Sequence, residues 1–515
     1  MDGSGQLDVA AFAAAFRRLT HDVHQLVPQR DSKLARAIAA HLGVDPLALP
    51  VVSERFPDSD HPNLQLALES LAAAGSDWEL FGLPVEAMHW QGFGLANLAS
   101  PGQQSPPFDA VAPAYVNVPI DVDETLPCVT LGIWLLRHDD VPVVVLVSLG
   151  DPHRPMAGGI KVEAMSVERD DAVGFLARLR TLAHELNVYR GKVLSFTFTE
   201  WGSFGLEFHR LPELTRDDLI LPEADLDAIE RHTLGVAAHA DRLRDAGRHL
   251  KRGLLLFGPP GTGKTFSVLY LCGQMPGRTT ILLSGQAAPT LGQAAAIARG
   301  LQPSMLVLED VDLIAMERTM PGMGTNPLLF QLLNEMDGLD EDADVIFVLT
   351  TNRVDLLEPA LAARPGRVDQ AVEIKLPDAE CRKRLLDRYL RGMRTDVDDL
   401  DDVIERTEGV SAAFLKELGR RAALVAAESS APQDELVVTS RDIIEALDDL
   451  LEHSTPILRS TLGAAPERAG AFELPFGMLA GPMTGGHFPT AGMTHMMFRA
   501  HTEEFIDDGD DGVDE

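Results

Sequence analysis

Near the middle of the chain lies a short stretch rich in glycine and proline, LFGPPGTGKTF. Four residues separate Gly258 from Gly263, which is followed by Lys264 and Thr265, and this is the spacing of a phosphate-binding loop. Glycines let the backbone approach phosphate oxygens, the lysine charge meets the β- and γ-phosphates, and the threonine hydroxyl can ligate Mg²⁺. The predicted nucleotide-binding residues are Gly258, Pro259, Pro260, Gly261, Thr262, Gly263, Lys264, Thr265 and Phe266.

The segments on either side of this loop predict how its backbone is held. Residues 252–257, RGLLLF, are apolar after a basic start, as expected for a strand buried on both faces. Residues 266–271, FSVLYL, read as the first turns of a helix, whose free N–H groups would point at the same spot as those of the loop. The alternative is a tight turn that binds nothing, and the complete pattern between a strand and a helix disfavours it. The sequence therefore predicts a nucleotide site.

Polar side chains follow two further apolar runs. The run 305–308 ends in Glu309 and Asp310, and the run 345–349 is followed by two threonines and Asn352. At the carboxyl edge of a parallel sheet, one carboxylate can hold Mg²⁺ while its neighbour polarises the attacking water. The amide of Asn352 can position that water. The carboxylates after the first run are Glu309, Asp310 and Asp312.

A pair of arginines forms the last predicted catalytic group. Arg364 and Arg367 flank a Pro-Gly turn in EPALAARPGRVD. Arginines on a rigid turn cannot easily reach phosphates bound by their own subunit, but they suit those of a neighbour. We therefore predict that both act across a subunit interface.

The chain resembles the AAA family of ATPases, within the wider AAA+ group, in five motifs that occur in order: GPPGTGKT, LVLEDVDLI, LLNEMDGL, TTNRVDLLEPAL and RPGRVD. The resemblance covers roughly residues 250–451. It implies a doubly wound α/β P-loop domain with a small α-helical lid, ATP and Mg²⁺ as ligands, and a ring, usually a hexamer. It also implies that Arg364 and Arg367 are arginine fingers acting in trans. In the lid, Tyr389 stands where many members have a nucleotide-contacting histidine.

Three features depart from the usual family pattern. The Asp-Glu pair is reversed as Glu309-Asp310, so a direct mapping gives Glu309 the magnesium role and makes Asp310 the catalytic base, with one methylene less reach. Slow turnover is expected. The pore-loop position reads Thr290-Leu291-Gly292 and lacks the usual aromatic residue. The arginine turn follows EPAL with one residue more than the commonest pattern.

Composition and patterning divide the chain into four parts. We predict an α+β domain over residues 1–220 that recognises a partner, followed by the AAA+ large domain over residues 221–377. A small helical lid is predicted over residues 378–455. Residues 456–515 are rich in Gly, Pro and Met, end in an acidic run, and are predicted to form a flexible tail.

The first hundred residues are predicted to be mainly helical. Apolar residues over 9–26 recur in steps of three and four, which favours a helix facing its own core over one that pairs with a partner helix. The runs CVTLGIWLL and VPVVVLVSL read as strands joined by a polar turn, and a helix is predicted over 170–186. VLSFTFTEWG and GLEFHRL read as another strand pair. His184-Glu185 begins a zinc-protease-like pattern that lacks its second histidine, so no metal site is predicted there.

The overall composition limits the class of protein. The net charge of −34 disfavours nucleic acid as the main partner. The three cysteines, Cys128, Cys272 and Cys381, lack metal-ligand spacing and fit a reducing compartment. The chain begins without a signal-peptide pattern, and its longest apolar run, near 141–149, is too short to span a bilayer. A cytoplasmic protein without a membrane partner is predicted.

Two functions from different classes remain open on the sequence. The leading hypothesis is an ATP-hydrolysing homohexamer that remodels or disassembles a protein complex. The alternative is a nucleotide-gated assembly factor or scaffold that hydrolyses ATP slowly and threads nothing. A DNA-directed motor is disfavoured by the charge. Stimulation of hydrolysis by a protein substrate would distinguish the first two.

Overall fold

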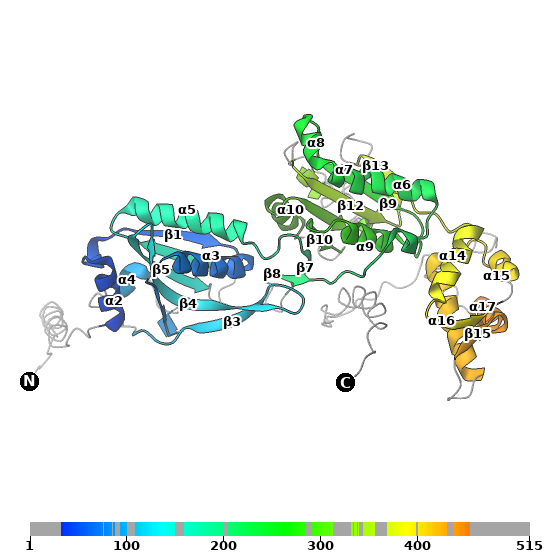
Figure 1. Cartoon of the computed structure of the whole chain (residues 1–515), viewed down its shortest axis with the longest axis horizontal. Coiled ribbons are helices and arrows are strands. Elements are labelled where there is room, and N and C mark those ends of the chain that lie inside the picture. Colours follow the sequence, from blue (N-terminus) through cyan, green and yellow to red (C-terminus); the bar gives the residue numbers. More distant parts are fainter. Residues whose placement is uncertain are drawn as a thin grey trace, which may run out of the picture. The chain divides into compact units, whose positions relative to one another are not determined.

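The computed structural model describes most of the chain, which falls into two compact units (Figure 1). The first unit comprises residues 1–188 and 199–205, and the second comprises residues 189–198 and 206–515. The described residues are 32–75, 77–84, 86–87, 93–99, 109–149, 159–198, 204–284, 290–312, 331–332, 334–336, 338, 343–355, 368–397, 400–429 and 436–453. The predicted helix over 9–26 and the predicted tail over 456–515 lie outside them.

The first unit contains an antiparallel sheet in the order β1-β6-β5-β4-β2, with β3 also paired to β4. The predicted hairpin is its centre: β4 turns into β5 through Asp139 and Asp140, whose φ angles of 49° and 65° are typical of the two-residue turns that join twisted strands. The strands are β1 (Val51–Phe56), β2 (Glu79–Gly82), β3 (Ala114–Pro119), β4 (Thr125–His138), β5 (Val141–Leu149) and β6 (Ile160–Met165).

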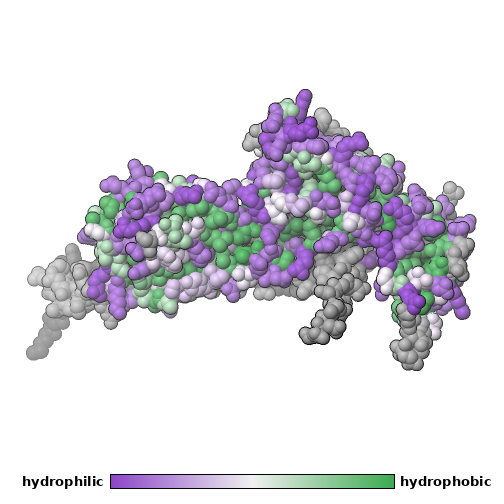
Figure 2. Space-filling model, in the orientation of Figure 1, coloured by the Kyte–Doolittle hydropathy of each residue, from purple (hydrophilic) through white to green (hydrophobic). Residues whose placement is uncertain are grey.

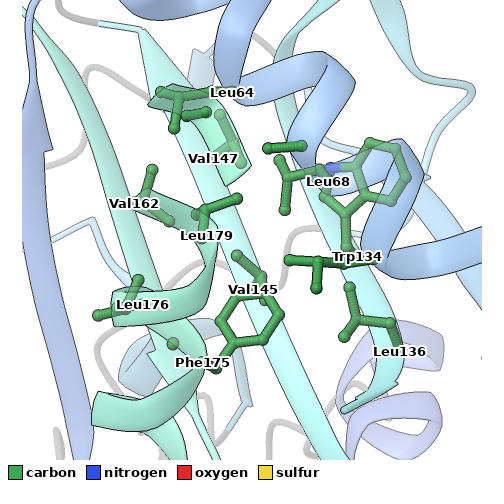
Figure 3. Packing of buried hydrophobic residues seen from close by; sticks show 14 of the residues in the cluster. Leu64, Leu68, Trp134, Leu136, Val145, Val147, Val162, Phe175, Leu176 and Leu179 are labelled. Carbon is green, nitrogen blue, oxygen red and sulfur yellow. The ribbon is translucent and has the colours of Figure 1, made fainter. Parts of the chain in front are cut away.

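Helices cover both faces of this sheet. One face packs on α3 and α5, and Figure 3 shows Leu68 of α3, Trp134 of β4 and Phe175 of α5 in that core. The other face packs on α2 and α4. The outward face of α5 is mostly hydrophilic (Figure 2), as expected for an amphipathic helix. The helices are α2 (Lys33–Leu42), α3 (His61–Ala74), α4 (Leu95–Ala99) and α5 (Arg169–Glu185), with short 3₁₀ turns at Pro46–Ala48 and Asp58–Asp60.

The prediction of an α+β N-terminal region is confirmed, and the described part of the first hundred residues is mainly helical as predicted, although two strands there were missed. Strands β1 and β2 both lie within that stretch. Their partners are distant in sequence, because β1 pairs with β6 and β2 pairs with β4. Local periodicity carries little information about such pairing, since strand formation depends on the neighbouring strands.

The second unit contains a seven-stranded sheet in the order β13-β9-β12-β11-β10-β7-β8. Neighbours from β13 to β7 are parallel. The central strands are buried along nearly their whole length, which explains why they read as uninterrupted apolar runs. The strands are β7 (Val193–Phe198), β8 (Phe204–Phe208), β9 (Arg252–Phe257), β10 (Thr279–Leu283), β11 (Ser304–Leu308), β12 (Val345–Thr351) and β13 (Gln370–Glu373).

Helices also pack on both faces of this second sheet. Helices α6 and α9 pack in the hydrophobic core on one face of the sheet. Helix α10, Leu332 and Met336 pack in the core on the other face. This arrangement is the predicted doubly wound parallel sheet. The helices are α6 (Glu223–His232), α7 (Leu234–Ala238), α8 (Ala240–Asp245), α9 (Lys264–Gln274) and α10 (Leu291–Gly300), with a 3₁₀ turn at Arg216–Asp218.

The predicted domain boundary near residue 220 is corrected by this sheet. The sequence places strands β7 and β8 within the N-terminal domain, but β7 pairs in parallel with β10 of the second unit. A hydrogen bond of 2.9 Å from Thr280 N to Lys192 O joins β10 to the residue before β7. The second unit therefore begins at Tyr189. The predicted strand pair itself is present, because β8 adjoins β7.

A helical subdomain with its own apolar core follows β13. It corresponds to the predicted lid. Its first helix is capped by Asp378, whose carboxylate accepts a hydrogen bond of 2.8 Å from Cys381 N. The elements are α14 (Ala379–Tyr389), β14 (Arg394–Asp396), α15 (Asp401–Arg406), α16 (Ala412–Ser429), β15 (Val437–Thr439) and α17 (Ser440–His453), with β14 and β15 parallel. Among the described residues, none of the helices combines the length and apolar composition needed to cross a bilayer.

Candidate nucleotide-binding site

The glycine-rich loop connects β9 to α9, as predicted. Gly258 has a φ of 147°, and a Cβ there would lie 2.2 Å from Ile374 O. Gly261 has a φ of 74°, and a Cβ there would lie 2.8 Å from the Cβ of Ala413 in the lid. Side chains at either position would collide with neighbouring atoms, so glycine is required. The lid contacts the loop directly, since Ala413 N donates a hydrogen bond of 3.0 Å to Gly261 O.

Lys264 is the first residue of α9, and its side chain lies inside the loop. The ammonium group donates hydrogen bonds of 2.9 Å to Gly258 O and 2.8 Å to Pro259 O. Burial lowers the pKa of Lys264 to about 8, and the nearby carboxylates of Asp310 and Asp312 oppose that change. An ammonium group has three donors, so one remains beyond the two loop carbonyls. The lysine charge is therefore held where a phosphate would enter.

Glu309 follows β11 and reaches the threonine of the loop. The Thr265 side chain faces its carboxylate and acts to lower the pKa of Glu309. Its Oε1 atom is buried and lacks a hydrogen-bond partner within the described part of the protein. Burial raises the pKa of Glu309 to about 7, and the negative charge of Asp310 adds to that rise. A buried carboxylate with a spare oxygen, beside a hydroxyl, fits Mg²⁺, which takes oxygen ligands from one or two side chains together with phosphates and water.

Asp310 adopts a different backbone conformation from its neighbour. Its φ of 49° lies in the left-handed region, which aspartate tolerates better than most residues. Its N–H donates a hydrogen bond of 3.0 Å to Thr350 Oγ1, and its Oδ1 accepts one of 3.2 Å from Asn352 Nδ2. Burial and the charge of Asp312 raise the pKa of Asp310, whereas Lys264 and Asn352 act in the opposite direction. The two carboxylates of the reversed pair thus have different partners.

The structure brings most of the predicted site residues to one edge of the sheet. Glu309 lies beside Thr265 on the loop side, and Asp310 lies beside Asn352 at the end of β12. Because β11 and β12 are parallel neighbours, their carboxyl ends meet at this edge. Arg364 and Arg367 lie outside the described residues.

Leu291 at the predicted pore-loop position and Tyr389 in the lid are both packed in hydrophobic cores. Leu291 is only 2% exposed and packs in the core against the sheet, so it is not presented to a substrate as a pore-loop residue would be. The burial of Leu291 is consistent with the expected lack of an aromatic grip at Thr290-Leu291-Gly292. Tyr389 packs against the lid core, and burial raises its pKa to about 12.

Sequence reasoning missed a contact between the lid and the loop helix. The Arg388 guanidinium lies over the ring of Phe266, 5.5 Å from its centroid, and Arg388 forms an ion pair with Asp218. Asp218 and Arg388 lie 170 residues apart. No local motif marks either residue. Phe266 is predicted to bind nucleotide, and the structure places its ring under this cation.

Comparisons with known proteins agree with this geometry. Residues 254–376 match the ATPase family associated with various cellular activities (AAA). Residues 254–376 therefore form an ATPase domain of the AAA type. The predicted family, the AAA+ fold and the presence of an ATPase domain are thereby confirmed.

Similar proteins come from several organisms. The chain is 30% identical over 267 residues to a proteasome-activating nucleotidase of Pyrococcus horikoshii, covering 50% of this chain and 66% of that protein. It is 34% identical over 223 residues to ATP-dependent zinc metalloprotease FtsH 2 of Sphaerobacter thermophilus, covering 41% and 33%. It is 31% identical over 263 residues to a cell division cycle protein 48 homolog of Archaeoglobus fulgidus, covering 47% and 36%. Less than two thirds of each of these relatives is covered.

Proposed function

We propose that this protein hydrolyses ATP with Mg²⁺ and uses the energy to remodel or disassemble a protein complex, as a homohexameric ring. The observation that carries the proposal is the pairing of Glu309 with Thr265 and of Asp310 with Asn352 beside Lys264. These pairs provide a metal-holding group and a proton-accepting group at one phosphate-binding loop. The names of the similar proteins, a proteasome-activating nucleotidase and an ATP-dependent protease, support action on proteins.

The proposed mechanism divides the work between the two carboxylates. Lys264 binds the β- and γ-phosphates of ATP, and the N–H groups of the loop and of α9 orient them. Thr265 and Glu309 would hold Mg²⁺, which would supply positive charge to offset that of the phosphates. Asp310 accepts a proton from the attacking water, and Asn352 orients both the water and the carboxylate. This division explains how the reversed Glu-Asp order remains compatible with hydrolysis.

The ring proposal rests on the two arginines of the RPGR turn. In this proposal Arg364 and Arg367 stabilise negative charge on the transferring phosphoryl group of a neighbouring subunit, as arginine fingers do. The N-terminal unit would recognise the protein partner. Nucleic acid is not proposed as a partner, because the net charge of −34 opposes contact with a phosphate backbone.

A trapping experiment tests the remodelling function. The Asp310→Asn variant, which we expect to bind ATP without hydrolysing it, is used to capture partners from an extract of the source cells. Lys264→Ala, which we expect to bind no ATP, is the matched control. A captured protein that requires ATP for binding and accelerates phosphate release by the wild-type protein supports the proposal. Identical captures by both variants, or a partner that leaves the rate unchanged, would contradict it.

The second candidate function is a slowly hydrolysing, nucleotide-gated scaffold. Two observations favour it: Leu291 is buried instead of being available to grip a polypeptide, and Asp310 is one methylene shorter than glutamate. This function predicts ATP-dependent assembly, measured by analytical ultracentrifugation, with phosphate release that no captured partner accelerates. Strong acceleration by a partner would exclude it.

A further inference from the structure

Asp312 is a buried carboxylate at the nucleotide site that has no part in the mechanism above. It is 4% exposed. Its Oδ1 atom accepts a hydrogen bond of 2.8 Å from Thr351 Oγ1 and another of 3.1 Å from Asn352 N. Burying a charged group is unfavourable unless it is hydrogen-bonded, so these contacts account for how the carboxylate is tolerated. Both donors belong to the carboxyl end of β12.

These bonds connect Asp312 to the proposed base through a single residue. Asn352 donates its main-chain N–H to Asp312 and its side-chain amide to Asp310. Thr351 Oγ1, which donates to Asp312, also accepts a hydrogen bond of 3.0 Å from Arg353 N. The last residue of β12 and the two residues after it are therefore fixed around one carboxylate. The position of the Asn352 amide therefore depends on the hydrogen bonds that the Asp312 carboxylate accepts.

We propose that Asp312 is a positioning residue for ATP hydrolysis, an inference that rests on the proposed ATPase function. Its carboxylate fixes the end of β12, so that the Asn352 amide holds the Asp310 carboxylate against the attacking water. The phosphate-binding loop joins β9 to α9 and shares no hydrogen bond with Asp312 among those described, and the carboxylate acts on Lys264 only through its charge. Loss of the anchor should therefore slow hydrolysis and spare nucleotide binding.

The test compares two replacements of Asp312 with a matched control in the full-length protein. Asp312→Ala removes the acceptor, whereas Asp312→Asn keeps an oxygen that can accept both hydrogen bonds. The control is Asp344→Ala, which removes another buried carboxylate at the opposite end of β12, where Asp344 pairs with Arg278 at 2.8 Å. For each variant, kcat and KM for ATP, the Kd for a fluorescent ADP analogue and the unfolding temperature are measured.

We expect Asp312→Ala to lower kcat by about 10–100-fold, because a misplacement of about 1 Å in a catalytic group costs up to about 10²-fold. The Kd for ADP should change less than about threefold. Asp312→Asn should recover most of kcat. Asp344→Ala should lower the unfolding temperature and leave kcat near that of the wild type. A purely structural role would not produce this split between kcat and Kd, nor the rescue by asparagine.

Several results would overturn the inference. Wild-type hydrolysis together with an unchanged kcat in Asp312→Ala would refute it while leaving the ATPase function intact. Equal loss in Asp312→Ala and Asp312→Asn would show that the acceptor oxygen is not what matters. A fall in ADP affinity that matches the fall in kcat would indicate a general disturbance of the site. Absence of hydrolysis by the wild-type protein would refute the proposed function and this inference together.

Discussion

Replacement of Asp310 by asparagine should separate hydrolysis from nucleotide binding. Asparagine keeps an oxygen that can accept the 3.2 Å hydrogen bond from Asn352 Nδ2, but it cannot take a proton from water at neutral pH. The contacts of Lys264 with Gly258 O and Pro259 O do not involve the substituted side chain. Nucleotide affinity should therefore remain equal or become tighter, because a negative charge near the phosphates is removed.

The size of the effect on hydrolysis follows from the role of a general base. Such a group contributes about 10²–10⁴-fold to a rate, and each tenfold corresponds to about 1.4 kcal/mol in the barrier. Asp310 is held by one side-chain hydrogen bond from Asn352 and is shorter than glutamate. We therefore expect the lower part of the range, a fall in kcat of about 10²–10³-fold.

The assay is steady-state phosphate release at saturating ATP and Mg²⁺, paired with titration of a fluorescent ADP analogue. Glu309→Gln is the matched control, since it changes the neighbouring carboxylate by the same chemistry. Its partner is Thr265, so we expect it to raise the Mg²⁺ concentration needed for half-maximal rate, with activity recovering at high Mg²⁺.

An exchange of these two phenotypes would refute the reasoning. If Glu309→Gln abolished turnover at every Mg²⁺ concentration while Asp310→Asn only shifted the Mg²⁺ dependence, Glu309 would be the base. Loss of ADP binding in Asp310→Asn would show that the carboxylate supports the loop instead of the reaction.

Three further predictions concern other parts of the chain. Gly261→Ala should weaken ADP binding and lower the unfolding temperature. The new Cβ would lie 2.8 Å from the Cβ of Ala413, and a left-handed backbone costs a residue other than glycine about 1–2 kcal/mol. Unchanged values in both measurements would contradict this prediction. Burial lowers the pKa of His61 below its usual 6.5. Near that pH the unfolded chain therefore binds a proton more readily than the folded unit does, so the free energy of unfolding, measured with urea, should fall as the pH drops through about 6.5. Fluorescence of Trp78 and Trp134, which stack on each other in the first unit, reports this unfolding, and His61→Gln should be less sensitive to pH than the wild type. Mixing the inactive variants Lys264→Ala and Arg364→Ala should restore some phosphate release if subunits exchange, whereas an inactive mixture despite co-assembly would argue against catalysis in trans.

The nucleotide site could be predicted because its parts are short and consecutive. The loop from Gly258 to Thr265 follows a strand and begins a helix, and the buried strands β11 and β12 read as apolar runs that end in polar residues. Parallel strands bring their carboxyl ends to one edge, so the meeting of Asp310 with Asn352 follows from strand order alone.

Contacts that depend on distant pairing could not be predicted. β7 reads as one strand of a local pair, and only its pairing with β10 places it in the parallel sheet of the second unit. The ion pair of Arg388 with Asp218 joins the lid to a segment far earlier in the chain. The role of Asp312 was hidden for another reason: three carboxylates near the end of one strand look alike in sequence, and only their hydrogen-bond partners distinguish them.

The central claim is that ATP is hydrolysed at the loop that holds Lys264, and phosphate release by the purified full-length protein tests it most directly. The wild-type protein should release phosphate from ATP in a Mg²⁺-dependent manner, and Lys264→Ala, folded to the same unfolding temperature, should release none above background. A wild-type protein that releases no phosphate, or a Lys264→Ala variant that releases it at the wild-type rate, would contradict the claim.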